Sequence, residues 1–122
     1  IINPDHWDYD SSLAEYKSLN YAKAQNGVII QRVFILKDKE ELEIMKPIIL
    51  EQAENKIEVS YTFYEEINFS FYPDFTVLPD HSFGLYVPKL DKLLTVVATN
   101  SREFISDMVA DFNKIKSKST VL

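Results

Sequence analysis

The sequence contains no cysteine, only two glycines and no long apolar run. Without cysteine, neither a disulfide framework nor a thiolate metal site can form, which favours a reducing cytoplasmic location. A membrane-spanning helix needs roughly 20 apolar residues, so we expect no membrane association. Two glycines also leave no glycine-rich loop of the kind on which nucleotide phosphates rest, and we expect no cofactor.

Positive charge is scarce as well, because 13 Lys and Arg face 19 Asp and Glu, giving a formal net charge of −6. A nucleic-acid surface needs clustered cations, so nucleic acid is not an expected partner. The length of 122 residues suits one domain with its own core. The chain opens at Ile1, and residues 1–10 resemble neither a signal peptide nor a transit peptide. We therefore expect a single domain, with an extended lead-in over 1–10, excised from a longer protein.

The strongest strand pattern runs from Gly27 to Leu36. Its β-branched and aromatic residues are interrupted only by Gln31 and Arg32, which is typical of a strand covered on both faces in a parallel sheet. The alternating run Ile57–Phe63 predicts its parallel neighbour.

Helical patterns flank this strand. The first follows Ser11 and ends at Asn26-Gly27, a favourable left-handed stop. The second covers about 39–55 with Asp38 as its N-cap, and Pro47 inside it predicts a kink or two short helices. Its expected buried stripe consists of Leu42, Met45, Ile49 and Ala53.

The second half predicts an antiparallel meander and a closing helix. Short strands are expected over 75–78, 82–87 and 93–98, with a tight turn around Asp80-His81. Asn100 or Ser101 caps the closing helix, and residues 117–122 are expected to fray. The fold class is therefore α/β, with a mixed sheet of about five strands and helices on both faces.

Few residues point to chemistry. His6 and His81 have no other ligand at metal-site spacing. Asp74 and Asp80 flank a short strand and are weak candidates for a carboxylate pair, although turn formation beside prolines explains them equally well.

Arg32 is more informative, because a cation in an apolar strand must be paired or reach a polar rim. In the functional interpretation it holds an anionic ligand or an acidic partner segment. In the structural interpretation, which we favour, it pairs with Asp74, Glu58 or another carboxylate.

Aromatic residues are dense between Tyr61 and Phe75. They predict an apolar pocket, a partner-binding patch or simply the cover of a small sheet. In the partner-binding case, a homodimer would form through Phe69, Phe71 and Tyr72.

Over Tyr16–Lys116 the chain resembles one half of a phospholipase D-like domain, and is similar to the non-catalytic versions in bacterial signalling and regulatory proteins. The positions that carry the resemblance are Tyr16, Asn20, Ala22, Gly27, Val28, Ile30, Arg32, Val33, Phe34 and Ile35, followed by Asp74, Phe75, Val77 and Asp80. The catalytic motif of that family is His-x-Lys-x-x-x-x-Asp. When this motif is aligned on Asp80, the histidine and lysine positions hold Pro73 and Phe75, so the family's phosphodiester mechanism is not expected.

These observations predict a non-enzymatic sensory or regulatory domain that binds a small ligand or a partner domain. Open parallel sheets bind ligands at the carboxyl ends of their strands. The residues expected around such a cleft are Lys37, Asp38, Tyr64, Glu65, Asp74, Asp80 and His81, with Arg32 beneath them if its side chain points that way. Two alternatives remain open: a degenerate phosphodiesterase or other hydrolase using Asp74, Asp80 and His81, and a self-association module.

Overall fold

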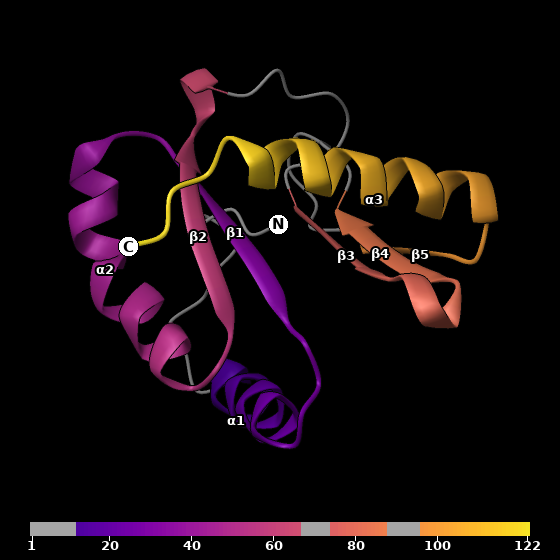
Figure 1. The fold of residues 1–122 in the computed structure, drawn as a ribbon, viewed down its shortest axis with the longest axis horizontal. Coiled ribbons are helices and arrows are strands. Elements are labelled where there is room, and N and C mark those ends of the chain that lie inside the picture. The colour runs from indigo at the N-terminus through magenta and orange to yellow at the C-terminus, as the bar shows by residue number, and fades with distance from the viewer. Residues whose placement is uncertain (1–11, 67–73, 88–95) are drawn as a thin grey trace.

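The computed structural model describes residues 12–66, 74–87 and 96–122, which form three α-helices and two small sheets (Figure 1). Two short 3₁₀ turns, Tyr64–Glu66 and Pro79–His81, complete the described elements. In chain order the helices and strands are α1 (Ser12–Gln25), β1 (Gln31–Leu36), α2 (Lys39–Glu54), β2 (Glu58–Phe63), β3 (Asp74–Leu78), β4 (Phe83–Val87), β5 (Val97–Thr99) and α3 (Arg102–Ser117).

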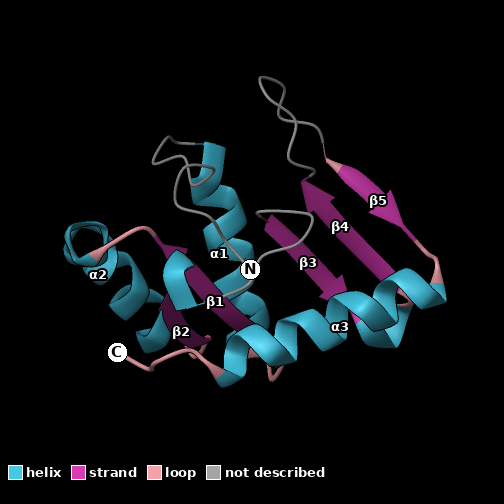
Figure 2. Ribbon diagram, turned by 90° about the horizontal axis from the view of Figure 1, so that it is seen from above, coloured by secondary structure: helices cyan, strands magenta, loops and turns pink. Residues whose placement is uncertain are grey.

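The strands form two sheets, so the expected single mixed sheet is wrong. β1 and β2 pair in parallel, from Gln31 opposite Glu58 to Leu36 opposite Phe63. β3, β4 and β5 form the expected antiparallel meander as a separate sheet. Helix α3 lies across both sheets (Figure 2). The α/β class, the parallel pair and the meander are thus confirmed, while side-chain packing rather than strand pairing joins the two sheets.

β1 is covered on both faces, as its composition predicts. Successive side chains of a strand point to opposite faces, and the strand is buried from its second residue to its last. One face contributes Val33 and Ile35 to a core shared with Phe75, Met108 and Ile115 of the other sheet and α3. The opposite face contributes Phe34 and Leu36 to a second core, whose other buried members are Ala24, Met45, Ile49, Ile57 and Val59.

Local signals in the sequence set the helix boundaries. The Asp38 side chain accepts a hydrogen bond of 2.9 Å from the backbone N–H of Glu41, so it is the predicted N-cap of α2. The Ser101 hydroxyl accepts one of 3.3 Å from the N–H of Phe104 at the start of α3. Gly27 follows α1 with a φ of 92°, a conformation that favours glycine.

α2 continues through Pro47 as one helix of 16 residues, so of the two predicted alternatives, a kink or two short helices, the second is wrong. Proline removes one backbone donor and crowds the preceding turn. Met45 and Ile49, on either side of it, are both 1% exposed and anchor the two halves of the helix in the same core. Burial of this apolar stripe therefore outweighs the local defect.

The segment after α3 does not fray at Ser119 and Thr120, contrary to expectation. Thr120 and Tyr61 exchange two backbone hydrogen bonds, of 2.8 and 2.9 Å, in an isolated antiparallel bridge. The Ser119 hydroxyl also donates to the hydroxyl of Ser60 at 2.7 Å. The chain thus covers part of the β2 edge that β1 leaves open, which satisfies backbone groups that water would otherwise solvate.

Candidate functional site

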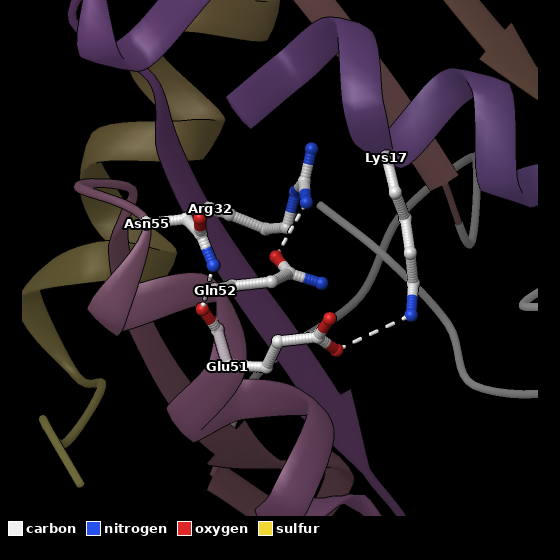
Figure 3. A network of polar contacts seen from close by, with 5 residues as sticks. All are labelled: Lys17, Arg32, Glu51, Gln52 and Asn55. Atoms are coloured by element: carbon white, nitrogen blue, oxygen red, sulfur yellow. Dashed lines mark hydrogen bonds and ion pairs between the residues drawn. The ribbon is translucent and has the colours of Figure 1, made fainter. Parts of the chain in front are cut away.

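A buried polar cluster lies where α1, α2 and β1 meet, and we define it as Tyr21, Arg32 and Gln52. Figure 3 shows Arg32 and Gln52. Gln52 is fully buried and Arg32 is 7% exposed. The Tyr21 ring packs against the second core, and its hydroxyl is buried. Polar side chains are rare at such depth unless they are paired, so the cluster is the first place to look for function.

The periodicity of two elements brings Arg32 and Gln52 together. Arg32 shares its strand face with Phe34, which packs on α2. Gln52 follows Ile49 by three residues and therefore lies on the same buried stripe of α2. Ala53, which we expected to complete that stripe, is exposed.

Arg32 and Gln52 bond directly. The Arg32 Nη1 group donates to Oε1 of Gln52, which fixes the orientation of the amide because only its oxygen can accept. The amide nitrogen therefore points away from the guanidinium, toward the side on which Lys17 and Glu51 lie (Figure 3). Within the described residues, this Nε2 group and the Tyr21 hydroxyl have no hydrogen-bond partner.

Glu58, one of the expected partners of Arg32, occupies the opposite face of the sheet. It accepts a hydrogen bond of 2.8 Å from Nε2 of Gln31 and lies 3.8 Å from the Lys116 ammonium. Arg32 donates to the neutral amide of Gln52 and takes part in further interactions, so its pairing with Asp74 or another carboxylate stays a prediction.

α1 is tied to α2 by polar contacts at the rim of the cluster. The Lys17 ammonium lies 3.4 Å from a Glu51 carboxylate oxygen, with side chains 26% and 47% exposed. Near the ends of the two helices, Nε2 of Gln25 donates to Oδ1 of Asn55 at 3.5 Å. Exposed contacts of this kind contribute less than about 1 kcal/mol each.

Burial raises the pKa of Tyr21 above its ordinary value, and the nearby Glu51 carboxylate raises it further, whereas the positive charge of Arg32 lowers it. Tyr21 is consequently a neutral hydroxyl at pH 7.

The residues expected around a cleft at the carboxyl ends of the parallel strands do not all lie there. Lys37 and Asp38 follow β1, and Tyr64 and Glu65 follow β2, so these four lie at that end of the parallel pair. Asp38 caps α2, and Tyr64 packs against the first core. Arg32 lies toward the amino end of β1, roughly 13 Å from Leu36 at about 3.3 Å per residue. The structure thus separates Arg32 from the expected cleft.

Asp74 opens β3, whereas Asp80 and His81 belong to the 3₁₀ turn after it. The length of β3 separates the two aspartates by more than about 13 Å along the strand, so their backbone positions do not converge. The side chains of Asp74 and His81, like residue His6, lie outside the described parts of the structure.

The aromatic stretch is partly described. Phe75 is buried in the first core, and Tyr61 and Phe63 pack edge to face, with ring centroids 5.8 Å apart, beside the second. For these three, the interpretation as cover for a sheet holds. The expected dimer residues Phe69, Phe71 and Tyr72 lie outside the described residues.

Within residues 12–66, 74–87 and 96–122, no three or more His, Asp and Glu side chains gather as metal ligands. None of the helices in these same ranges combines the length and apolarity needed to cross a membrane. Comparison of the chain with protein-family models, curated proteins and solved structures finds no match.

Proposed function

We propose that the protein is a non-enzymatic binding domain, of the sensory or regulatory kind, and that a small ligand binds at the polar cluster. The observation that carries this proposal is the pair of buried polar groups, the Tyr21 hydroxyl and the Gln52 amide nitrogen, that lack partners. An unsatisfied buried polar group costs about 1–3 kcal/mol. A ligand that bonds to both groups removes that cost, so binding and folding reinforce each other.

The chemistry of the cluster favours binding over catalysis. At neutral pH a guanidinium and an amide neither attack a substrate nor abstract a proton. The raised pKa of Tyr21 makes its hydroxyl a poor base and a poor nucleophile as well. The resemblance to non-catalytic phospholipase D-like domains agrees with this proposal, but the proposed site lies toward the amino ends of the parallel strands rather than their carboxyl ends.

A thermal-shift screen of the purified chain tests the proposal. The panel contains organic acids, nucleotides, sugars and phosphorylated metabolites. A ligand that binds only the folded state stabilises it by about 2.7 kcal/mol at a hundredfold excess over its dissociation constant. We expect a hit whose shift is reduced in Tyr21→Phe, which removes one buried hydroxyl and keeps the ring.

Tyr61→Phe is the matched control, because Tyr61 packs beside the same core on β2 and belongs to neither the cluster nor its rim. A shift that Tyr21→Phe and Tyr61→Phe leave equally intact places the ligand elsewhere and contradicts the proposed site. A folded protein that no compound in the panel stabilises contradicts the proposed function.

A further inference from the structure

We infer that the polar cluster selects ligands that accept a hydrogen bond, because Arg32 fixes the direction of the Gln52 amide; this inference rests on the proposed function. Arg32 donates to Oε1 of Gln52, which leaves the Nε2 group as the unpartnered end of the amide. An amide nitrogen donates and cannot accept. The ligand atom that meets Gln52 is therefore an acceptor, such as a carbonyl oxygen, whether the whole ligand is neutral or charged.

Gln52 sets this preference, whereas Tyr21 does not. A hydroxyl can donate or accept, so the Tyr21 side chain bonds to a ligand of either kind. Gln52 is fully buried, so water does not satisfy its Nε2 group when a ligand donor faces it. Two facing donors both stay unsatisfied, which weakens binding by about tenfold or more. Gln52 thus determines the specificity of the cluster, and Arg32 is a positioning residue that acts through it.

Two substitutions change the direction of the hydrogen bond that the cluster offers. Gln52→Glu keeps an oxygen for Arg32 and replaces the Nε2 donor with a second acceptor, and its bond to the guanidinium favours the ionised carboxylate. We expect this variant to prefer ligands that donate. Arg32→Met releases Oε1, so the amide can turn either end toward a ligand, and we expect the preference between acceptors and donors to fall.

NMR titration of the full ¹⁵N-labelled chain measures the preference. The reporters are the side-chain NH₂ resonance of Gln52 and, in the variants, the backbone amides of residues 21 and 52. Pyridine and pyrrole are the paired probes at neutral pH, because the uncharged pyridine nitrogen only accepts and the pyrrole N–H only donates. Acetone and acetate distinguish a neutral from an anionic oxygen acceptor. Any hit from the thermal screen is titrated in the same way.

We expect saturable shifts with an acceptor and an affinity for pyrrole about tenfold weaker or less. This preference should reverse in Gln52→Glu and shrink in Arg32→Met. Asn113→Asp is the matched control, because it makes the same amide-to-carboxylate change at an exposed position of α3, and it should keep the wild-type preference.

Two results overturn the inference and leave the proposed function standing, provided that Tyr21→Phe weakens the binding and so places it at the cluster. In the first, pyrrole binds as tightly as pyridine. In the second, a bound acceptor or screening hit has the same affinity for Gln52→Glu as for the wild type. A folded Arg32→Met protein that keeps the full preference overturns the positioning role of Arg32, and if that variant does not fold, Gln52→Glu decides. If no probe and no screened compound shifts the reporters, the inference and the proposed function both fail.

Discussion

A double-mutant cycle on Arg32 and Gln52 measures how strongly the two buried side chains depend on each other. Gln52→Leu removes the acceptor and leaves the guanidinium in the core without it. Arg32→Met removes the donor and leaves a fully buried amide with neither of its groups bonded. The double variant replaces both with apolar side chains on facing elements of the second core.

The expected magnitudes follow from the hydrogen bond and the burial. A hydrogen bond to a charged group contributes about 1.5–3 kcal/mol. Gln52→Leu removes this bond but also removes the unpaired Nε2 group, so we expect it to lower the free energy of unfolding by less than the bond contributes. In the Arg32→Met background the same change replaces an unpaired amide with a hydrocarbon, and we expect it to be neutral or stabilising. Arg32 takes part in further interactions, but they are lost in both Arg32→Met variants and cancel in the cycle. The coupling energy should therefore be about 1.5–3 kcal/mol.

Urea unfolding of the four proteins supplies the free energies, provided that the m-value stays constant across the set. The matched control is a cycle on the exposed pair Glu43 and Lys46, whose charged atoms lie 3.5 Å apart on α2. We expect its coupling energy to be below about 0.5 kcal/mol. A coupling energy for Arg32 and Gln52 as small as that of the control refutes the reasoning.

Three further predictions concern other contacts. Tyr21→Phe should raise the free energy of unfolding by about 1 kcal/mol, because it removes a buried unpaired hydroxyl. Since the raised pKa of Tyr21 delays its ionisation in the folded state, the wild type should lose stability relative to Tyr21→Phe as pH rises above about 10; urea unfolding at pH 8 and pH 11 measures this, and an unchanged difference contradicts it. Thr120→Pro should lower the free energy of unfolding by about 1 kcal/mol and speed hydrogen exchange at the Tyr61 amide, because proline has no N–H to donate to the Tyr61 carbonyl. Thr120→Ala keeps that N–H, so exchange at the Tyr61 amide should remain as in the wild type. Gly84→Ala should lower the free energy of unfolding by about 1–3 kcal/mol, because the added Cβ would lie 2.9 Å from Sδ of Met108. Thermal unfolding measures this loss. If the loss is as large in a Met108→Ala background, crowding against Met108 is not its cause.

The sequence allowed most elements of the fold to be predicted, because their signals are local. Asp38 and Ser101 cap helices where expected, and Gly27 follows α1 in the left-handed conformation. No local signal in the sequence indicates that the five strands divide into two separate sheets. Alternation along a strand reports which faces are buried, but it does not report which edges pair, so the apolar character of β1 fits both a five-stranded sheet and the observed arrangement.

The candidate site was predicted only at Arg32. Its cation in an apolar strand is visible in the sequence, but its bond to Gln52 was not among the expected contacts. The available signal was the position of Gln52 on α2, seven residues after Met45 and three after Ile49, which places a polar side chain on the apolar stripe. Ala53 was expected on the buried stripe of α2 because it is apolar, although the spacing from Met45 and Ile49 favours Gln52. The burial of the Tyr21 hydroxyl depends on how α1 packs against the second core, and no local sequence pattern predicts that packing.

Tyr21 provides the sharpest contrast between a structural and a functional role of the cluster. If the cluster only stabilised the fold, an unpaired hydroxyl would be a defect, and Tyr21→Phe would improve stability with no loss elsewhere. If the cluster binds a ligand, the same substitution should stabilise the free protein and weaken the complex. Opposite effects on the two states are typical of sites that accept lower stability in return for binding. Stability and affinity measured on this single variant, against Tyr61→Phe, therefore separate the two roles.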